Sequence, residues 1–195
     1  MARNNNLHQA KAQKNDLFFT LYESIEKEMR YYQENFAMNE PTVLCNCDNP
    51  FESNFVKYLL KNFQALNLKR VIAISYAGSA MLEETKAFYM AYLPEFDVAN
   101  HGIVADIRSY DAALGCETPE AILNQISSNG DNILTELTGD GDFRSAESIR
   151  YLQECDLVFT NEPFSLAKEF LELVLRYQKN FLALFPLNIV TYKNV

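Results

Sequence analysis

Three short turns contain the side chains best suited to binding or catalysis. Each turn follows a β-prone run and precedes a predicted amphipathic helix. They are Cys45-Asn46-Cys47-Asp48-Asn49-Pro50, Gly139-Asp140-Gly141-Asp142-Phe143-Arg144-Ser145 and Thr160-Asn161-Glu162-Pro163-Phe164-Ser165. In open parallel sheets, ligands bind at the carboxyl ends of the strands. We therefore expect these turns to meet at one edge of a sheet and to form a binding site.

The third turn combines an amide, a stiff backbone and an aromatic ring, supplied by Asn161, Pro163 and Phe164. These groups suit an extruded nucleobase, which is read by hydrogen bonds to its edge and by an aromatic ring stacked on its face. The same residues also suit an ordinary helix start, with Asn161 or Ser165 as the cap and Phe164 packed on the core. Because such turns are common, the motif taken alone favours the helix start.

A zinc site is the weaker alternative for the first turn. Cys45 and Cys47 are separated by one residue, whereas zinc ligands are usually spaced by about two to four. The histidines, His8 and His101, are both distant in sequence. Small, buried thiols in a β-prone run are the better interpretation, and we expect no metal.

The elements that must position these turns alternate along the chain. β-prone runs lie at 42–47, 71–76, 156–160 and 181–185, and helical apolar spacing covers 25–36, 50–66, 144–154 and a segment from Ser165 onward. Pro50 suits the first turn of the second of these helices. The alternation predicts an α/β fold with a doubly wound, mostly parallel sheet.

The middle of the chain, residues 77–142, is less regular. It contains a possible helix at 80–91, a strand near 102–107, a helix at 119–126 and a strand at 133–137. We expect a polar leader over 1–15 and a single α/β domain over 16–195, with an irregular or inserted region at about 77–138.

Composition limits the partners. The chain has 195 residues, of which 48% are hydrophobic and 13% aromatic, and a formal net charge of −9. Duplex DNA attracts clustered Lys and Arg, so this charge excludes a generally DNA-binding surface and leaves only local contacts. The sequence has no apolar signal segment and no run of about 18 apolar residues. We expect a cytoplasmic protein of a bacterial or phage-infected cell, without a membrane partner.

The order of the motifs resembles a known family. Asp16-Leu17-Phe18-Phe19-Thr20, Val43-Leu44-Cys45-Asn46-Cys47-Asp48, Gly141-Asp142-Phe143-Arg144-Ser145, Val158-Phe159-Thr160-Asn161-Glu162-Pro163-Phe164-Ser165 and Ile189-Val190-Thr191-Tyr192-Lys193 occur in sequence. Together they closely resemble the adenine-specific DNA methyltransferases of the EcoRI type. The resemblance spans nearly the whole chain apart from its middle, and it implies a Rossmann-like fold that uses S-adenosylmethionine.

The resemblance also implies residue roles. The residues expected at the methyl donor are Asp16, Phe18, Thr20, Cys45, Asp48, Asp142 and Phe143. In the third turn, Asn161 and the backbone carbonyl of Glu162 would accept hydrogen bonds from the amino group of a flipped adenine. Pro163 would stiffen this turn, and Phe164 would stack on the base. The two acceptors free the nitrogen lone pair for attack, so positioning and electrostatics supply the rate and no metal is needed.

The chain departs from the family at two motifs. Asn161-Glu162-Pro163-Phe164 stands where the family has Asn-Pro-Pro-Phe, and Leu17 and Phe19 replace Glu and Tyr in the leading motif. Family members also continue past Lys193 with further strands and a target-recognition region. We therefore expect a sheet that is incomplete on its C-terminal side, with an open edge at 181–185.

These departures leave two functions open. One is a methyltransferase of weak or no activity that acts on DNA. The alternative is a non-catalytic binding protein on this scaffold, such as a phage-encoded inhibitor of a bacterial restriction or CRISPR complex. A protein partner, a second copy or the chain's own polar leader would cover the open sheet edge.

Overall fold

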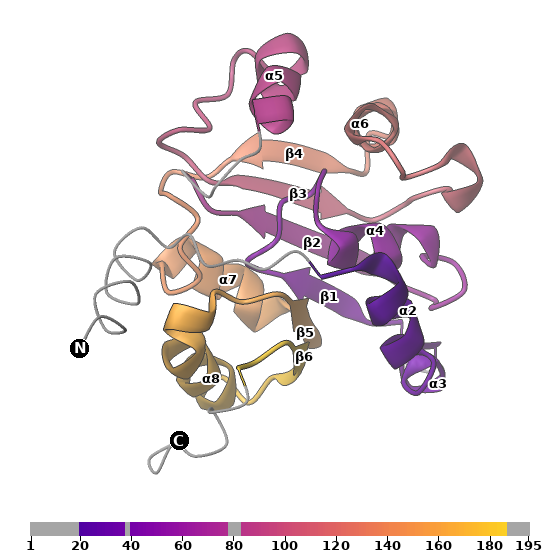
Figure 1. The fold of residues 1–195 in the computed structure, drawn as a ribbon, viewed down its shortest axis with the longest axis vertical. Helices are drawn as coiled ribbons and strands as arrows, with labels where there is room; N and C mark the ends of the chain where they lie inside the picture. The colour runs from indigo at the N-terminus through magenta and orange to yellow at the C-terminus, as the bar shows by residue number, and fades with distance from the viewer. Residues whose placement is uncertain (1–19, 38–39, 78–82, 187–195) are drawn as a thin grey trace.

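The computed structural model describes residues 20–37, 40–77 and 83–186, and these residues form one six-stranded sheet in the order β4-β3-β2-β1-β5-β6. Figure 1 shows the strands stacked in this order from top to bottom. The strands are β1 (Thr42–Cys45), β2 (Arg70–Ser75), β3 (Ile103–Ile107), β4 (Ile133–Glu136), β5 (Leu157–Thr160) and β6 (Asn180–Ala183).

Strand directions bring the predicted turns to one edge. β1 pairs in parallel with β2 and β5, and β5 pairs in parallel with β6. β3 runs antiparallel between β2 and β4. The carboxyl ends of β1, β2, β4 and β5 therefore share an edge with the amino end of β3, and the prediction of a mostly parallel sheet is confirmed.

Helices cover both faces of the sheet. They are α2 (Tyr22–Met29), α3 (Gln33–Ala37), α4 (Asn54–Lys61), α5 (Glu83–Tyr92), α6 (Pro119–Ser128), α7 (Ala146–Glu154) and α8 (Ala167–Arg176), with short 3-10 turns η1 (Ala112–Leu114) and η2 (Phe164–Leu166). α2, α4, α5 and α6 pack into one core cluster, and α7 and α8 pack into the other. This is the doubly wound arrangement that the sequence predicted.

Side chains alternate between these two cores. In β2, Val71 and Ala73 face the cluster that contains α4, while Ile72 and Ile74 face the cluster that contains α7 and α8. Each of the four side chains has 0% exposure. A parallel strand that is buried on both faces reads as a continuous apolar run, which is why this strand was evident in the sequence.

The predicted helix over 25–36 is divided in two. α2 ends at Met29, and the amides of Tyr31 and Tyr32 donate to carbonyls three residues back, which tightens the chain before α3 begins. Met29 and Phe36 are both buried. The tighter turn thus allows two short helices to bury their apolar side chains where one straight helix was expected.

The predicted position of Pro50 in the first turn of a helix is wrong. α4 begins at Asn54, and the Ser53 hydroxyl caps it by accepting hydrogen bonds from the amides of Phe55 and Val56. Pro50 lies in the preceding turn, where the Asn49 carbonyl accepts from the Ser53 amide at 3.0 Å. The cap, rather than the proline, sets the start of this helix.

The irregular middle of the sequence supplies β3, α6 and β4, close to the expected ranges, together with α5. β3 is buried along its whole length, and its register with β2 extends from Val71↔Ile107 to Ser75↔Ile103. This stretch therefore contributes two adjoining strands to the sheet that supports the site.

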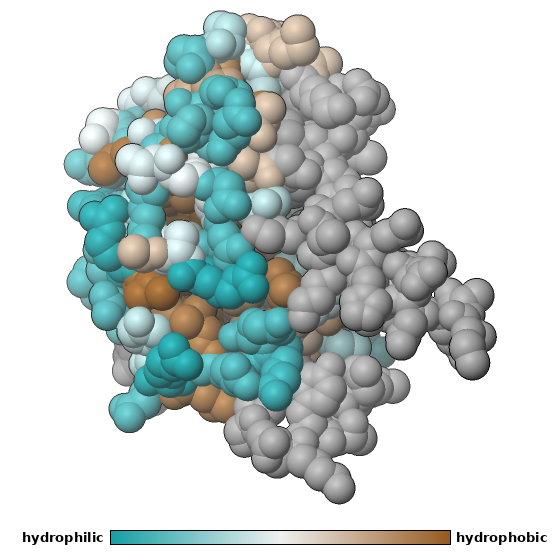
Figure 2. Space-filling model, turned by 90° about the vertical axis from the view of Figure 1, so that its left-hand side faces the viewer, coloured by the Kyte–Doolittle hydropathy of each residue, from teal (hydrophilic) through white to brown (hydrophobic). Residues whose placement is uncertain are grey.

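A view turned by 90° shows a mainly hydrophilic surface (Figure 2). Hydrophobic atoms gather chiefly in its lower half, at the height of α7 and α8 in Figure 1. In the part of the chain that the structure describes, no helix is long and apolar enough to cross a membrane.

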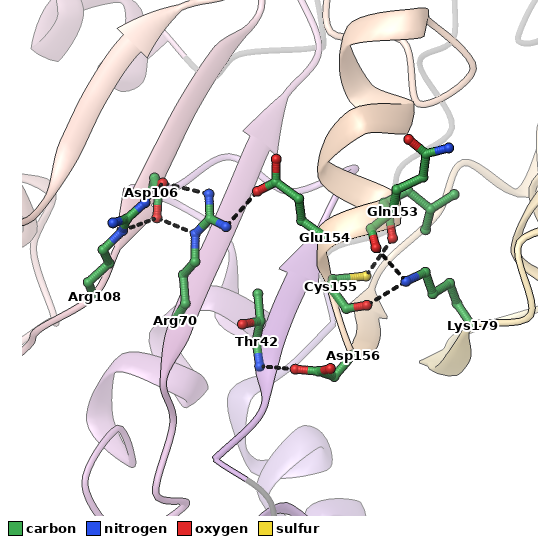
Figure 3. A network of polar contacts seen from close by, with 10 residues as sticks. Thr42, Arg70, Asp106, Arg108, Gln153, Glu154, Cys155, Asp156 and Lys179 are labelled. Atoms are coloured by element: carbon green, nitrogen blue, oxygen red, sulfur yellow. Dashed lines mark hydrogen bonds and ion pairs between the residues drawn. The ribbon is translucent and has the colours of Figure 1, made fainter.

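A polar network joins the elements at the edge opposite the predicted site (Figure 3). The Arg70 guanidinium donates to both oxygens of Asp106, at 2.6 and 2.7 Å, and to Glu154 at 2.7 Å. Asp156 accepts from the Thr42 amide at 2.8 Å, which links the end of α7 to the start of β1. These contacts fix β1, β2, β3 and α7 relative to one another.

Candidate active site

The segments at the carboxyl edge pack backbone against backbone. The Ala77 amide donates to the Asp140 carbonyl at 2.7 Å, and the Gly102 amide donates to the Gly139 carbonyl at 2.9 Å. Gly141 has a φ of 78°, and a Cβ atom there would lie 2.3 Å from the Ser75 carbonyl oxygen. Only glycine fits this position, because both the conformation and the space exclude a side chain.

Asp48 joins the turn after β1 to the turn after β5. Its carboxylate accepts hydrogen bonds from the Ser53 hydroxyl at 2.6 Å, the Thr160 hydroxyl at 2.5 Å and the backbone amide of Asn161 at 3.2 Å. The Thr160 hydroxyl in turn accepts from the Cys47 amide at 3.2 Å. Two of the predicted turns, more than a hundred residues apart in sequence, are thereby held together at Asp48.

Burial determines the ionisation of these groups. It raises the pKa of Asp48 to about 6, although hydrogen bonds from Ser53, Thr160 and the Asn161 amide act in the opposite direction. Burial, followed by the charge of Asp48, also raises the pKa of the Cys45 and Cys47 thiols well above the ordinary value. The thiols are therefore neutral at physiological pH and are not activated nucleophiles.

A small pocket of about 30 Å³ lies between the turns, and it is lined by Asn46, Cys47, Tyr76, Gly141, Asp142, Phe143, Pro163 and Leu166. The Asn46 side chain is 2% exposed, and its Nδ2 atom has no hydrogen-bond partner among the described residues. A buried amide donor without a partner costs free energy, which an acceptor on a ligand would offset. Sequence analysis missed Asn46, although it lies in the first predicted turn.

The second turn forms one wall of this pocket. Phe143 is buried and packs edge-on against Phe170, with ring centroids 5.6 Å apart. Arg144 donates to both oxygens of Asp142, at 2.9 and 2.6 Å, and lies over the Phe143 ring at 5.4 Å. The carboxylate and the aromatic ring predicted at the donor are thus fixed side by side.

The third turn is not a side-chain cap. In the described structure, Leu166 occupies the N-cap of α8 and Pro163 that of η2, and neither makes a side-chain cap hydrogen bond. The alternative in which Asn161 or Ser165 caps the helix is therefore wrong. Instead, the Asn161 amide donates to Asp48, and Phe164 begins η2 with its side chain half-buried.

Glu162, the residue that departs from the family motif, is 0% exposed. Its carboxylate is therefore not displayed on the surface. It is close enough to raise the pKa of the Cys47 thiol, after the larger effects of burial and of Asp48. The substitution places a carboxyl group beside the joined turns rather than on the outer surface.

Of the predicted residues, Asp142, Phe143 and Pro163 line this pocket. Asp48 and Asn161 are joined by a hydrogen bond beside it, but they do not line it. Cys45 is 0% exposed and packs in the core. Thr20 lines a larger apolar groove with Phe55 and Phe159. Asp16 and Phe18 lie outside the described residues.

A metal centre has no support in this region. Within residues 20–37, 40–77 and 83–186, no group of three or more His, Cys, Asp or Glu side chains is placed to hold a metal ion.

A doubly wound sheet with polar turns joined at its carboxyl edge is consistent with the S-adenosylmethionine-dependent methyltransferase fold. Residues 6–195 match the family model described as adenine-specific methyltransferase EcoRI. The chain belongs to this family.

Curated relatives agree with this assignment. The chain is 38% identical over 194 residues to the type II methyltransferase M.EcoRI of Escherichia coli, covering 100% of this chain and 52% of that protein. It is 32% identical to M.MgeORF184P of Mycoplasma genitalium and 31% identical to M.MpnI of Mycoplasma pneumoniae, in each case over 96% of this chain and 46% of the relative. The chain thus spans about half the length of the curated relatives it matches. It matches no solved structure.

Proposed function

We propose that this chain binds S-adenosylmethionine and supports methyl transfer to N6 of an adenine in DNA. The observation that carries the proposal is the joining of two predicted turns by Asp48, beside a pocket with an unpaired buried amide donor. Family membership supports the same reaction, since the matched family is described as adenine-specific and all three relatives are named type II methyltransferases.

The donor site would be built around the pocket between the turns. Asp142 and Phe143 would face the adenosine part of S-adenosylmethionine, and the side-chain amide of Asn46 would donate to a polar atom of this ligand. Asp16, Phe18, Thr20 and Cys45 remain predicted donor residues by family resemblance alone. A pocket of about 30 Å³ is far below the several hundred Å³ of a typical ligand site, so donor binding must widen it.

The chain's own residues would act by positioning. The Asn161 side chain and the Glu162 backbone carbonyl would accept hydrogen bonds from the adenine amino group. These bonds take the nitrogen lone pair out of conjugation with the ring, so that it can attack the methyl group. Pro163 would limit the movement of the turn, and Phe164 would stack on the base. S-adenosylmethionine, when bound, supplies an electrophilic methyl group. These residues fit the reaction without a metal ion or a covalent intermediate.

We expect the reaction to be slow. Glu162 lacks the fixed φ that a proline gives the family motif, and it adds a buried carboxyl group beside the turn. The alternative, a non-catalytic binding protein with a protein partner or a second copy at the sheet edge, is favoured by no contact or comparison described above. Because the relatives are bacterial methyltransferases, the proposed site of action is the DNA of a bacterial cytoplasm.

The test is donor binding measured by titration calorimetry, followed by transfer of a labelled methyl group to duplex DNA. Wild type should bind S-adenosylmethionine, and Glu162→Pro should transfer methyl groups faster than wild type because the turn is stiffer. Asp142→Asn should weaken donor binding by about 10-fold, the equivalent of one hydrogen bond to a charged group.

Asp131→Asn is the matched control. It makes the same change at an exposed position beside the start of β4, at the opposite edge of the sheet. The proposal is abandoned if neither wild type nor Glu162→Pro binds the donor.

A further inference from the structure

The pairing between β1 and β5 ends before the two turns begin. The ladder contains Val43↔Leu157 and Leu44↔Val158 only. Beyond it, Thr160 at the end of β5 is 0% exposed, and its hydroxyl accepts from the Cys47 amide and donates to Asp48. Side-chain hydrogen bonds therefore take over the alignment of the two segments where the backbone ladder stops.

The contacts converge on the amide next to the proposed catalytic side chain. One oxygen of Asp48 accepts both the Thr160 hydroxyl and the Asn161 amide, while the other accepts the Ser53 hydroxyl at the start of α4. The carboxylate is thus oriented from α4 and fixes the backbone of Asn161 from the other side. We refer to Cys47, Asp48, Thr160 and Asn161 as the turn clamp.

We propose that Asp48 and Thr160 are positioning residues, which hold the Asn161 turn against the turn after β1 in the geometry that methyl transfer requires. This inference rests on the proposed function. Neither Asp48 nor Thr160 lines the pocket between the turns. They act through Asn161, and they are distinct from the groups proposed to touch the donor or the base.

Packing alone does not require this arrangement. Replacing hydrogen-bonded groups by apolar groups of the same shape can be nearly neutral for stability, whereas burying a carboxylate carries a desolvation cost. A clamp that only joined the strands could therefore be apolar. The polar version additionally fixes the direction of one backbone N–H, and small errors in the placing of catalytic groups cost rate strongly.

Thr160→Val tests the clamp, because valine keeps the shape of threonine and removes its hydroxyl. We expect the kcat for methyl transfer by the full chain to fall about 10- to 100-fold, with the KM for S-adenosylmethionine changed less than about 3-fold. Thr160→Ser restores the hydroxyl and should recover most of the rate. Thr135→Val is the control: it makes the same change at an exposed position of β4, where the hydroxyl donates to the Glu136 carbonyl.

Asp48 provides a second pair of variants in case Thr160→Val does not fold. Asp48→Leu removes the acceptor and should lower kcat in the same way. Asp48→Asn keeps a carbonyl oxygen toward Thr160 and Asn161, with its amino group toward the Ser53 hydroxyl, and should retain most of the rate.

Amide hydrogen exchange over residues 157–166 gives a readout that needs no activity. Thr160→Val and Asp48→Leu should speed exchange in this segment, while Thr135→Val should leave it at the wild-type rate. If wild type transfers no methyl group, the proposed function fails. The proposal that Asp48 and Thr160 hold the Asn161 turn is then tested by amide hydrogen exchange alone. Unchanged exchange in both variants overturns the clamp, as does a wild-type kcat in Thr160→Val of an active chain.

Discussion

At the scale of single residues, the site depends on a carboxylate kept in a buried position. Asp48 is 4% exposed, and burial raises its pKa to about 6 despite the hydrogen bonds that favour the charged form. Its charge, after burial, contributes to the raised pKa of the Cys45 and Cys47 thiols. The chain therefore keeps an ionised group at neutral pH at the expense of stability.

This cost predicts a pH-dependent effect of Asp48→Asn. The pKa of about 6 in the folded state lies above the unfolded value of about 3.9, so Asp48 favours folding below about pH 4. That contribution is lost as the pH rises through about 6. Asparagine does not titrate. The stability of Asp48→Asn relative to wild type should therefore rise by about 2 kcal/mol between pH 4 and pH 7.5.

Urea unfolding at a series of pH values measures this difference. Ser53→Ala leaves the carboxylate in place and removes a hydrogen bond that lowers the pKa of Asp48, so it should show at least the wild-type pH dependence. A stability difference between Asp48→Asn and wild type that stays constant from pH 4 to pH 7.5 would contradict the assignment.

At the scale of elements, the close packing of β2 against the turn after β4 depends on Gly141. Alanine there would meet the Ser75 carbonyl and would have to adopt a φ of 78°. We expect Gly141→Ala to lower the free energy of unfolding by more than about 2 kcal/mol. Gly139→Ala is the matched control, because a Cβ at Gly139 has no described atom within 4 Å.

The control should change stability by less than about 1 kcal/mol. Denaturant unfolding of both variants decides the matter, and equal effects at the two glycines would rule out the steric explanation.

The network at the opposite edge yields a second prediction at this scale. The Arg70 and Asp106 side chains are only 15% and 7% exposed. Arg70→Ala would leave Asp106 with only its longer contact to the more exposed Arg108, so it should cost about 2 kcal/mol. Glu154→Gln, at the 51% exposed end of the network, should cost less than about 1 kcal/mol.

The sign of the pH effect is opposite to that of Asp48. Burial raises the pKa of Asp106, but hydrogen bonds and charges from Arg70 and Arg108 outweigh burial and lower it overall. Its stabilising contribution is therefore present above the unfolded pKa and is lost as the pH falls. Acid unfolding of Arg70→Ala should show a weaker pH dependence than wild type, and an unchanged profile would count against this pairing.

At the scale of the whole molecule, charge limits the encounter with DNA. The net charge is −9, and the guanidinium groups of Arg70, Arg108 and Arg144 are already paired with carboxylates. The 26 Asp and Glu residues outnumber the 17 Lys and Arg residues, so the surface as a whole attracts phosphate weakly. We expect weak duplex binding whose salt dependence has a log–log slope shallower than about −3, as measured by fluorescence anisotropy between 50 and 200 mM salt. A slope near −6 or steeper would require a basic surface that this composition does not provide.

The sequence by itself determined the alternation of elements, the family and the positions of the turns, because these are local properties. The buried run of β2 and the order of the motifs can be read along the chain without knowing what touches what. The predictions of one helix over 25–36 and of Pro50 in a helical turn were wrong for a related reason. Local tightening and a serine cap set those boundaries, and apolar spacing does not report either of them.

Only the tertiary structure decided which residues of the turns act together. β3 runs antiparallel to β2, so Gly102 before β3 lies against Gly141 and the Ser75 carbonyl. Asn46, rather than Cys45, lines the pocket. The backbone amide of Asn161 donates to Asp48, and the Asn161 side chain does not cap the following helix. Asp48 and Thr160 are 112 residues apart. A contact across that distance is set by how the sheet packs, and no periodicity or spacing along the chain encodes it.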